Sequence, residues 1–279
     1  MEWSPGNRGN IEDARGRSGG GRMIQMGGLG VGGMLLLLIL SWVSGTNLFS
    51  MFGGGGSGAI DSSQGPAPSS PAEERTIDMV DAVAGDVQDT WEHILGNRYE
   101  RTKVVLFHDS LDSSCGTADA ATGPFYCPVD HKVYLDTGFF DELDRRFGAP
   151  GDFAQAYVIA HEFGHHVQQL LGLDRGSRSG SAMGANSASV AVELQADCFA
   201  GIWGNAASQS GRFQAGHVEL QPGDAEEGLR AAAAIGDDRL QKMTTGRVMP
   251  DRFTHGTSAQ RVEAFRRGFE SGDVRMCER

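Results

Sequence analysis

Residues 160–166 of the chain read Ala-His-Glu-Phe-Gly-His-His, and this stretch constrains the fold more than any other. His161 and His165 stand four residues apart, which on an α-helix places both imidazole rings on one face, one turn apart. Two neutral ring nitrogens placed in this way can bind one Zn²⁺. Glu162 lies beside the same site, where its carboxylate can take a proton from a metal-bound water. His166 points about 100° away from that face and is expected to be a structural or a surface residue.

A second helical pattern, Val192-Glu-Leu-Gln-Ala-Asp197, supplies the remaining ligand. Hydrolytic zinc sites use three protein ligands and leave one position open for water, and Glu193 is the expected third ligand. Asp197 follows one turn later, where it can accept the free N–H of His161 and fix its tautomer. Both carboxylates could instead belong to a solvated helix face. The surrounding run is apolar, however, and unpaired carboxylates are costly in such a setting.

Three blocks of the sequence together resemble one family. They are His161-Glu-x-x-His165, Glu193-Leu-Gln-Ala-Asp197-Cys-Phe-Ala-Gly and Thr254-His-Gly-Thr-Ser-Ala-Gln-Arg261. The combination is similar to the bacterial neutral zinc metallopeptidases, which share the zinc site of the wider gluzincin group, and the similarity covers nearly the whole chain. The resemblance implies a zincin-like domain and a zinc-dependent endopeptidase with one Zn²⁺ per chain. It names no substrate beyond a peptide or protein.

His255 is the candidate for stabilising the transition state. A metallopeptidase needs a hydrogen-bond donor for the developing oxyanion of the tetrahedral intermediate. The segment that contains His255 and Arg261 resembles the His-then-Arg block placed similarly in other gluzincins. A capping or structural role for His255 stays open, and Tyr126, Tyr134 and Tyr157 are alternatives for the donor. Arg261 could pair with a carboxylate near the site.

The hydrophobic periodicity around these blocks predicts a helix-rich α+β domain with a small sheet. Helices are expected over residues 73–95, 152–171, 187–207, 224–243 and 258–268, and strands over residues 104–107 and 132–135. Residues 132–135 could form an edge strand that binds an extended peptide. An interior strand is the alternative.

Four cysteines allow three disulfide pairings, so the connectivity is open at this level. Cys115 and Cys127 enclose a loop that a disulfide could close, which stabilises the fold by about 3 kcal/mol in the chain-entropy model. Cys198 and Cys277 would then tie the C-terminal tail to the second helix of the site. A zinc site made of cysteines is the alternative, but no Cys-x-x-Cys spacing exists. Paired cysteines favour an oxidising compartment.

The N-terminal region contains a candidate membrane anchor, because no residue between Arg22 and Asp61 is charged. A bilayer core of about 30 Å requires about 20 apolar residues in a helix. Residues 23–45 supply that length, although glycines dilute the first half. A buried core helix and a cleaved signal peptide are alternatives, but no Ala-x-Ala site follows the segment.

Charges on either side of this segment predict its orientation. Arg8, Arg15, Arg17 and Arg22 precede it, and the next basic residue is Arg75. The positive-inside rule therefore places the N-terminus in the cytoplasm and exports the rest. The expected organisation is a cytoplasmic tail over residues 1–22, a single transmembrane anchor over 23–45, a flexible Gly/Ser/Pro linker over 46–71 and the zinc peptidase domain over 72–279.

The net charge of −12 argues against a general nucleic-acid-binding protein, because such proteins neutralise phosphates with basic residues. The sequence thus predicts a membrane-anchored zinc endopeptidase that hydrolyses peptide bonds through a metal-bound water. The alternative is a non-catalytic zinc-binding scaffold or interaction protein of the cell envelope on the same fold. Glu162 favours the enzyme, because a scaffold needs no base beside the metal. Nothing in the sequence indicates an oligomeric state.

Overall fold

A computed structural model of the chain describes residues 1–16, 69–119, 123–145, 148–149, 151–173, 183–209 and 216–278. The described residues form an α+β domain that is rich in helices, as predicted. The helices are α3 (Pro71–Leu95), α4 (Phe139–Arg145), α5 (Asp152–Leu171), α6 (Ala188–Ala207), α7 (Asp224–Ala234), α8 (Asp237–Thr245) and α9 (Ser258–Ser271). The strands are β1 (Glu2–Trp3), β2 (Ile11–Asp13), β3 (Val104–Phe107), β4 (Ser110–Ser113), β5 (Gly116–Asp119), β6 (Phe125–Cys127), β7 (Lys132–Asp136) and β8 (Val218–Glu219).

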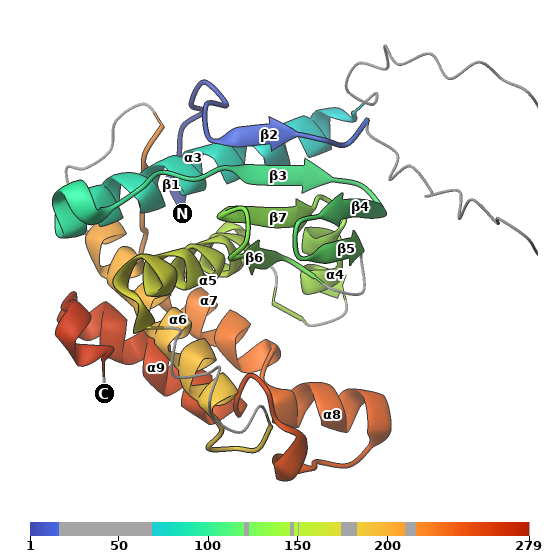
Figure 1. Ribbon diagram of the computed structural model, residues 1–279. Coiled ribbons are helices and arrows are strands. Elements are labelled where there is room, and N and C mark those ends of the chain that lie inside the picture. The colour runs from blue at the N-terminus through green and yellow to red at the C-terminus, as the bar shows by residue number, and fades with distance from the viewer. Residues whose placement is uncertain are drawn as a thin grey trace, which may run out of the picture.

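The main sheet has four strands in the order β2-β3-β7-β6. Strands β2, β3 and β7 run parallel, and β6 pairs antiparallel with β7. Figure 1 shows the sheet above α5, α6 and α9, with α3 running behind β2 and β3 and with β6 on the side that faces α5. The prediction that residues 132–135 form an edge strand is wrong, because β6 covers that side of β7. At three residues, β6 is too short to show a periodic pattern in the sequence.

Two helix contacts position the site, and both depend on a glycine. A Cβ on Gly164 of α5 would lie 2.9 Å from the carbonyl oxygen of Ala196 on α6. A Cβ on Gly268 of α9 would overlap the carbonyl oxygen of Cys198 on α6. Real Cβ atoms essentially never come this close to a carbonyl oxygen, so only glycine permits the observed approach of the backbones. Helix α6 is therefore held directly between α5 and α9.

The N-terminal residues belong to the domain. Strand β2 pairs with β3, and β1 pairs antiparallel with β8. The prediction of a separate tail over residues 1–22 is thus wrong for residues 1–16. Strands of two and three residues give no periodic signal, and the arginines of this segment were used only to predict the orientation of the anchor. The domain also begins slightly before residue 72, because Ser70 caps α3 and Pro71 is its first residue.

Both expected disulfides are present, between Cys115 and Cys127 and between Cys198 and Cys277. The predicted anchor over residues 23–45 lies outside the described residues, as does the predicted linker up to residue 68. Among the residues that the structure does describe, no helix combines the length and the apolar character that crossing a bilayer requires.

Candidate metal centre

Three predicted ligands converge between α5 and α6. The candidate ligand atoms of His161, His165 and Glu193 all lie within 4.8 Å of one another. The Nε2 atom of His161 is 3.2 Å from one carboxylate oxygen of Glu193, and Nε2 of His165 is 3.6 Å from the other. The two imidazole rings stand nearly perpendicular, at 89°. Both rings therefore direct Nε2 toward the same carboxylate.

Asp197 holds the other nitrogen of His161, as the sequence predicted. Its Oδ1 lies 2.8 Å from Nδ1 of His161, and the carboxylate is completely buried. Arg261 of α9 donates to both oxygens of Asp197 at 2.8 Å, and the Tyr157 hydroxyl donates to Oδ1. Burial alone would raise the pKa of Asp197, but Arg261 and His161 lower it to about 2. Asp197 is thus a carboxylate that accepts the Nδ1–H of His161 and leaves Nε2 free to bind a metal.

Two glutamines that the sequence did not single out do the same for His165. Nδ1 of His165 is 2.9 Å from Oε1 of Gln168, and Nε2 of Gln168 donates to Oε1 of Gln195 at 3.0 Å. Gln195 in turn donates to the carbonyl oxygen of Cys277 at 3.0 Å. Because a carbonyl oxygen can only accept, this chain fixes both amide orientations and makes Gln168 the acceptor for Nδ1–H of His165.

The electrostatics of the three groups suit a cation. Burial opposes a charge on His161, but Asp197 and Glu193 raise its pKa to about 10. The pKa of His165 is also raised, against burial, by Glu193. The pKa of Glu193 is well below its ordinary value despite burial, because both histidines face it. Two imidazole nitrogens and a carboxylate around a point that favours positive charge form a donor set that fits Zn²⁺.

Glu162 lies beside these ligands without joining them. Its side chain is buried and accepts a hydrogen bond from the backbone N–H of Tyr126 on β6. Burial raises the pKa of Glu162, although His161 and His165 act in the opposite direction. A carboxylate with a raised pKa is a better proton acceptor and donor near neutral pH than an exposed one.

His255 lies on the loop before α9, with its side chain half exposed. Asp237 at the start of α8 organises this loop, because its Oδ2 accepts the backbone N–H of Thr254, His255 and Gly256 at 2.7–3.0 Å. Oδ1 of Asp237 is 3.3 Å from Nδ1 of His255. The pKa of His255 is raised by Asp237, opposed by burial and assisted by Glu193. The effect of Glu193 is one of charge alone, because the hydrogen bonds described for His255 go to Thr254 and Asp237 and not to the metal ligands. Nothing in the sequence pattern pointed to Asp237.

The tyrosines considered as alternative donors all have other hydrogen-bond partners. The Tyr157 hydroxyl is bound to Asp197 and Arg261, and that of Tyr134 to Asp130. The Tyr126 hydroxyl lies between His166 and Gln169. His166 itself is buried and bonds to the carbonyl oxygen of Glu100 through Nε2, so its predicted structural role is confirmed.

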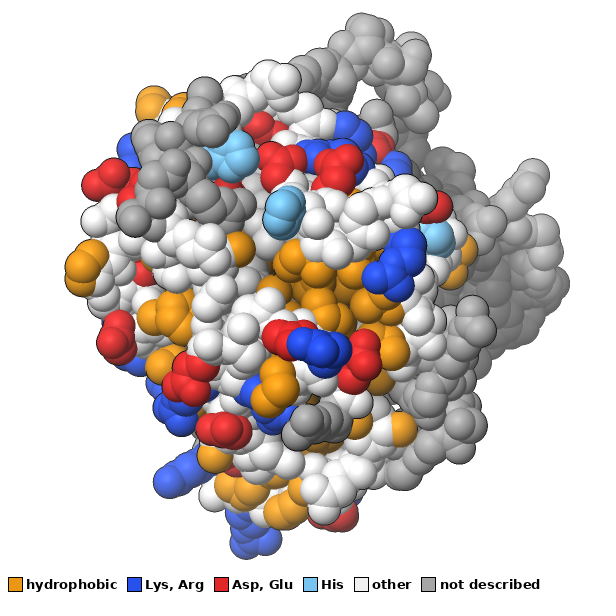
Figure 2. All heavy atoms as spheres, turned by 90° about the vertical axis from the view of Figure 1, so that its left-hand side faces the viewer, with side chains coloured by type: hydrophobic (Ala, Val, Ile, Leu, Met, Phe, Trp, Pro, Cys, Tyr) orange, Lys and Arg blue, Asp and Glu red, His pale blue; other side chains and the backbone are white. Residues whose placement is uncertain are grey.

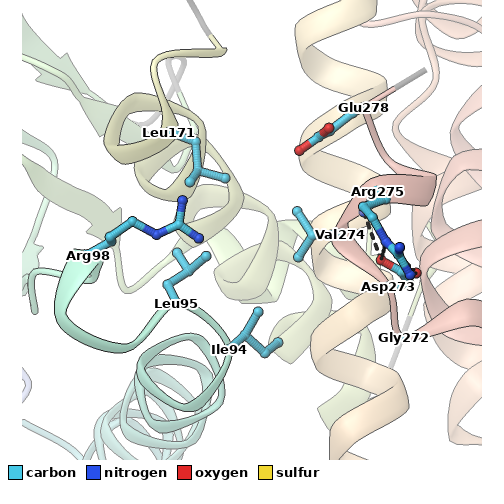
Figure 3. A pocket seen from close by; sticks show the side chains of 9 residues that line it. All are labelled: Ile94, Leu95, Arg98, Leu171, Gly272, Asp273, Val274, Arg275 and Glu278. Carbon is cyan, nitrogen blue, oxygen red and sulfur yellow. Dashed lines mark hydrogen bonds and ion pairs between the residues drawn. The ribbon is translucent and has the colours of Figure 1, made fainter.

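A separate cavity of about 360 Å³ opens on another part of the surface. Figure 2 shows hydrophobic side chains gathered in a hollow with charged side chains around it. Figure 3 shows a cavity between the ends of α3 and α5 and the C-terminal tail. Its lining is Ile94, Leu95, Arg98, Leu171, Gly272, Asp273, Val274, Arg275 and Glu278. None of the metal ligands lines this cavity, so it is distinct from the metal centre.

Comparison with known proteins agrees with this geometry. The profile of the family described as "Putative neutral zinc metallopeptidase" matches residues 1–279. The relative named "Uncharacterized protein YpfJ" of Escherichia coli is 42% identical over 283 residues, covering 96% of this chain and 94% of that protein. "Uncharacterized protein Rv2575" of Mycobacterium tuberculosis is 44% identical over 201 residues, covering 71% of this chain and 68% of that protein. No solved structure matches. With this full-length match and a His-His-Glu centre on two facing helices, the chain belongs to the neutral zinc metallopeptidase family.

Proposed function

We propose that the protein is a zinc-dependent endopeptidase in which His161, His165 and Glu193 hold one Zn²⁺. The bound ion would supply Lewis-acid activation of the scissile carbonyl and of the attacking water. Glu162 takes the proton from that water and returns it to the departing amine. The observation that carries the proposal is the burial of Glu162 beside the ligands, with its carboxylate fixed by the backbone of β6.

His255 is the proposed donor to the developing oxyanion. Its hydrogen bond with Asp237 and the nearby charge of Glu193 favour the protonated ring, which has a donor to offer. The loop also packs against α6, because Gly256 lies close to Val190 and Leu194 on either side of Glu193. A donor on this loop is preorganised before substrate arrives, which is the condition for strong transition-state stabilisation.

An extended substrate is proposed to lie along β6. This strand is an edge of the main sheet, and the backbone N–H of its central residue, Tyr126, points to Glu162. Edge strands bind extended peptides through main-chain hydrogen bonds, which suits cleavage within peptides of varied sequence. The substrate class is therefore a peptide or an unfolded protein segment.

The activity can be tested by incubating a mixed peptide library with the full chain. Cleavage products identified by mass spectrometry, lost on chelation and restored by Zn²⁺, are the expected result. Bound zinc without cleavage of any peptide would instead support the non-catalytic scaffold. The full chain is required, because a fragment beginning at residue 72 would lack β1 and β2.

Gln168→Met is expected to weaken zinc binding by about 10–100-fold, because His165 loses the acceptor that fixes its tautomer. The affinity can be measured by competition with a chromophoric chelator. Gln155→Met, on the same helix but outside the hydrogen-bond chain, is the matched control and should bind zinc normally. Unchanged affinity in Gln168→Met would show that the chain from Cys277 to His165 has no role in metal binding.

Asp237→Asn is expected to move the alkaline limb of kcat/KM to lower pH. The pKa of His255 is raised in the native protein, so the protonated donor persists until the pH rises through that raised value. Loss of the Asp237 charge lowers this pKa, and the donor is lost sooner as the pH increases. Asp238→Asn is the control, since Asp238 bonds to Ser258 instead. If the alkaline limb does not move in Asp237→Asn, His255 is not the donor in the mechanism. If His255 is the donor, His255→Ala should lower turnover by about 10²-fold.

A membrane-associated, extracytoplasmic location is proposed as well. Two disulfides with no free cysteine among the described residues favour an oxidising compartment. The charge-free stretch between Arg22 and Asp61 favours attachment to a membrane.

A further inference from the structure

The N-terminal segment, residues 1–16, completes the main sheet. Strand β3 is buried along its whole length and reads Val-Val-Leu-Phe. On one side it pairs with β7, and on the other with β2, in the register Ile11–Val104 to Asp13–Leu106. Without the N-terminal segment, β3 would become an apolar edge strand, which is prone to aggregation. The sheet therefore needs this segment to cover β3.

A buried carboxylate on α3 depends on the same segment. Asp81 is almost fully buried on a helix face that is otherwise largely apolar. Its side chain accepts the backbone N–H of Arg8 at 2.8 Å and of Asn10 at 2.9 Å, together with the side-chain amide of Asn10 at 3.1 Å. Gln88, also buried, donates to Oδ1 of Asn10 at 2.9 Å. A buried carboxylate without such partners would be strongly destabilising, so α3 is built to receive residues 8–10.

Arg8 and Arg15, which contributed to the prediction of a cytoplasmic N-terminus, form ion pairs within this domain. Arg8 lies 2.7 Å from both Glu74 and Asp78. Arg15, whose side chain is only 1% exposed, lies 2.7 Å from Asp13 and 2.9 Å from Glu73. These charges are neutralised by acidic partners in the fold. The positive-inside rule counts basic residues of short loops, and folded domains are translocated largely regardless of their charge, so these two arginines give no evidence for a cytoplasmic N-terminus.

The ion pair between Arg15 and Glu73 also holds Gly16 close to the start of α3. Gly16 and Ser69 are the two described residues on either side of residues 17–68. Figure 1 shows the end of β2 beside the start of α3. A single crossing of the membrane between Gly16 and Ser69 would separate these points by the hydrocarbon thickness of about 30 Å. An ion pair of 2.9 Å cannot span that distance.

We propose that residues 1–16 lie on the same side of the membrane as the catalytic domain and fold as part of it. A single-pass topology would place residues 1–16 and the catalytic domain on opposite sides of the membrane, so the proposal excludes the topology expected from the charges. This proposal is independent of catalysis, because it rests only on contacts between the N-terminal segment and α3 and β3.

The first test uses a native contact in the full chain in its membrane. Nζ of Lys132 on β7 lies 2.6 Å from Oε2 of Glu12 on β2, so a carbodiimide should join them by a zero-length amide bond. Mass spectrometry of digested membranes is expected to find the peptide pair. Lys132→Arg keeps the charge pair but forms no such amide, and should abolish the product. Absence of the cross-link in the native protein, under conditions in which the carbodiimide couples an added amine to the exposed carboxylates of the domain, would overturn the proposal.

The second test compares two exposed positions, Asn7 in the N-terminal segment and Val129 in the loop after β6. Asn7→Cys and Val129→Cys are treated with a membrane-impermeant maleimide in right-side-out vesicles. Equal labelling of both supports the proposal. Labelling of Val129→Cys alone, with Asn7→Cys protected until lysis, overturns it. Protection of both until lysis also supports a shared side and would overturn only the extracytoplasmic location. Neither readout depends on the peptidase activity of the protein itself, so the peptidase proposal is tested separately.

Discussion

Replacing Glu162 by glutamine is expected to lower kcat by about 10²–10⁴-fold while the protein keeps its zinc. The amide has nearly the same shape as the carboxylate and can still meet the backbone N–H of Tyr126 through its oxygen. It cannot take a proton from the attacking water. Turnover of a peptide identified from the library, together with zinc content by atomic emission, would measure both quantities on one preparation.

His165→Ala is the informative comparison for this variant. It removes a nitrogen from the group of three converging ligands, so zinc content and activity should fall together. In Glu162→Gln, zinc content should stay native while activity falls. If Glu162→Gln cleaves at the native rate, Glu162 is not the base even if the three ligands are correct. Loss of zinc from Glu162→Gln would make this residue part of the metal coordination.

Arg261→Met is expected to destabilise the domain by about 3–5 kcal/mol, because it leaves the buried charge of Asp197 without its main partner. For a domain of this size, such a loss lowers Tm by roughly 6–20 °C. Both side chains are almost completely buried, so solvent cannot replace the lost pairing. Thermal unfolding followed by circular dichroism would give the change in Tm.

Arg266→Met is the matched control on the same helix. Arg266 is exposed and pairs only with exposed Glu263 among the contacts described, so its Tm should be nearly native. A double variant, Asp197→Asn with Arg261→Met, should recover part of the stability, because the uncompensated charge is gone. A native Tm for Arg261→Met would contradict the buried ion pair as a stabilising feature of the site.

The metal centre was the most predictable part of the molecule, for a physical reason. The four-residue spacing of His161 and His165 fixes their relation within one helix, whatever the rest of the chain does. Glu193 and Asp197 have the same four-residue spacing on a second helix, so their relation is also fixed locally. The structure brings both pairs together as expected.

What the sequence did not reveal depends on contacts between distant segments. Gln168 carries a local signal, since it follows His165 by three residues, but its meaning requires Gln195 and the carbonyl of Cys277. Asp237 reaches the loop of His255 only because α8 folds back onto it. Strand β2 has only three residues and shows no hydrophobic pattern, so its pairing with β3 could not be predicted from the sequence. In each case, tertiary packing decides between alternatives that look the same in the sequence.

The close approach of α5, α6 and α9 has a consequence for how this family can diverge. At position 268 even a methyl group would force α9 away from α6 and draw Arg261 away from Asp197. We therefore expect random mutagenesis under selection for activity to reject every substitution of Gly268, although this residue touches neither the metal ligands nor Glu162. A homologous chain that retains all three ligands but carries a larger residue there would need a differently packed scaffold. A glycine at position 268 is thus expected to accompany the three ligands in homologues that share this packing of α6 and α9.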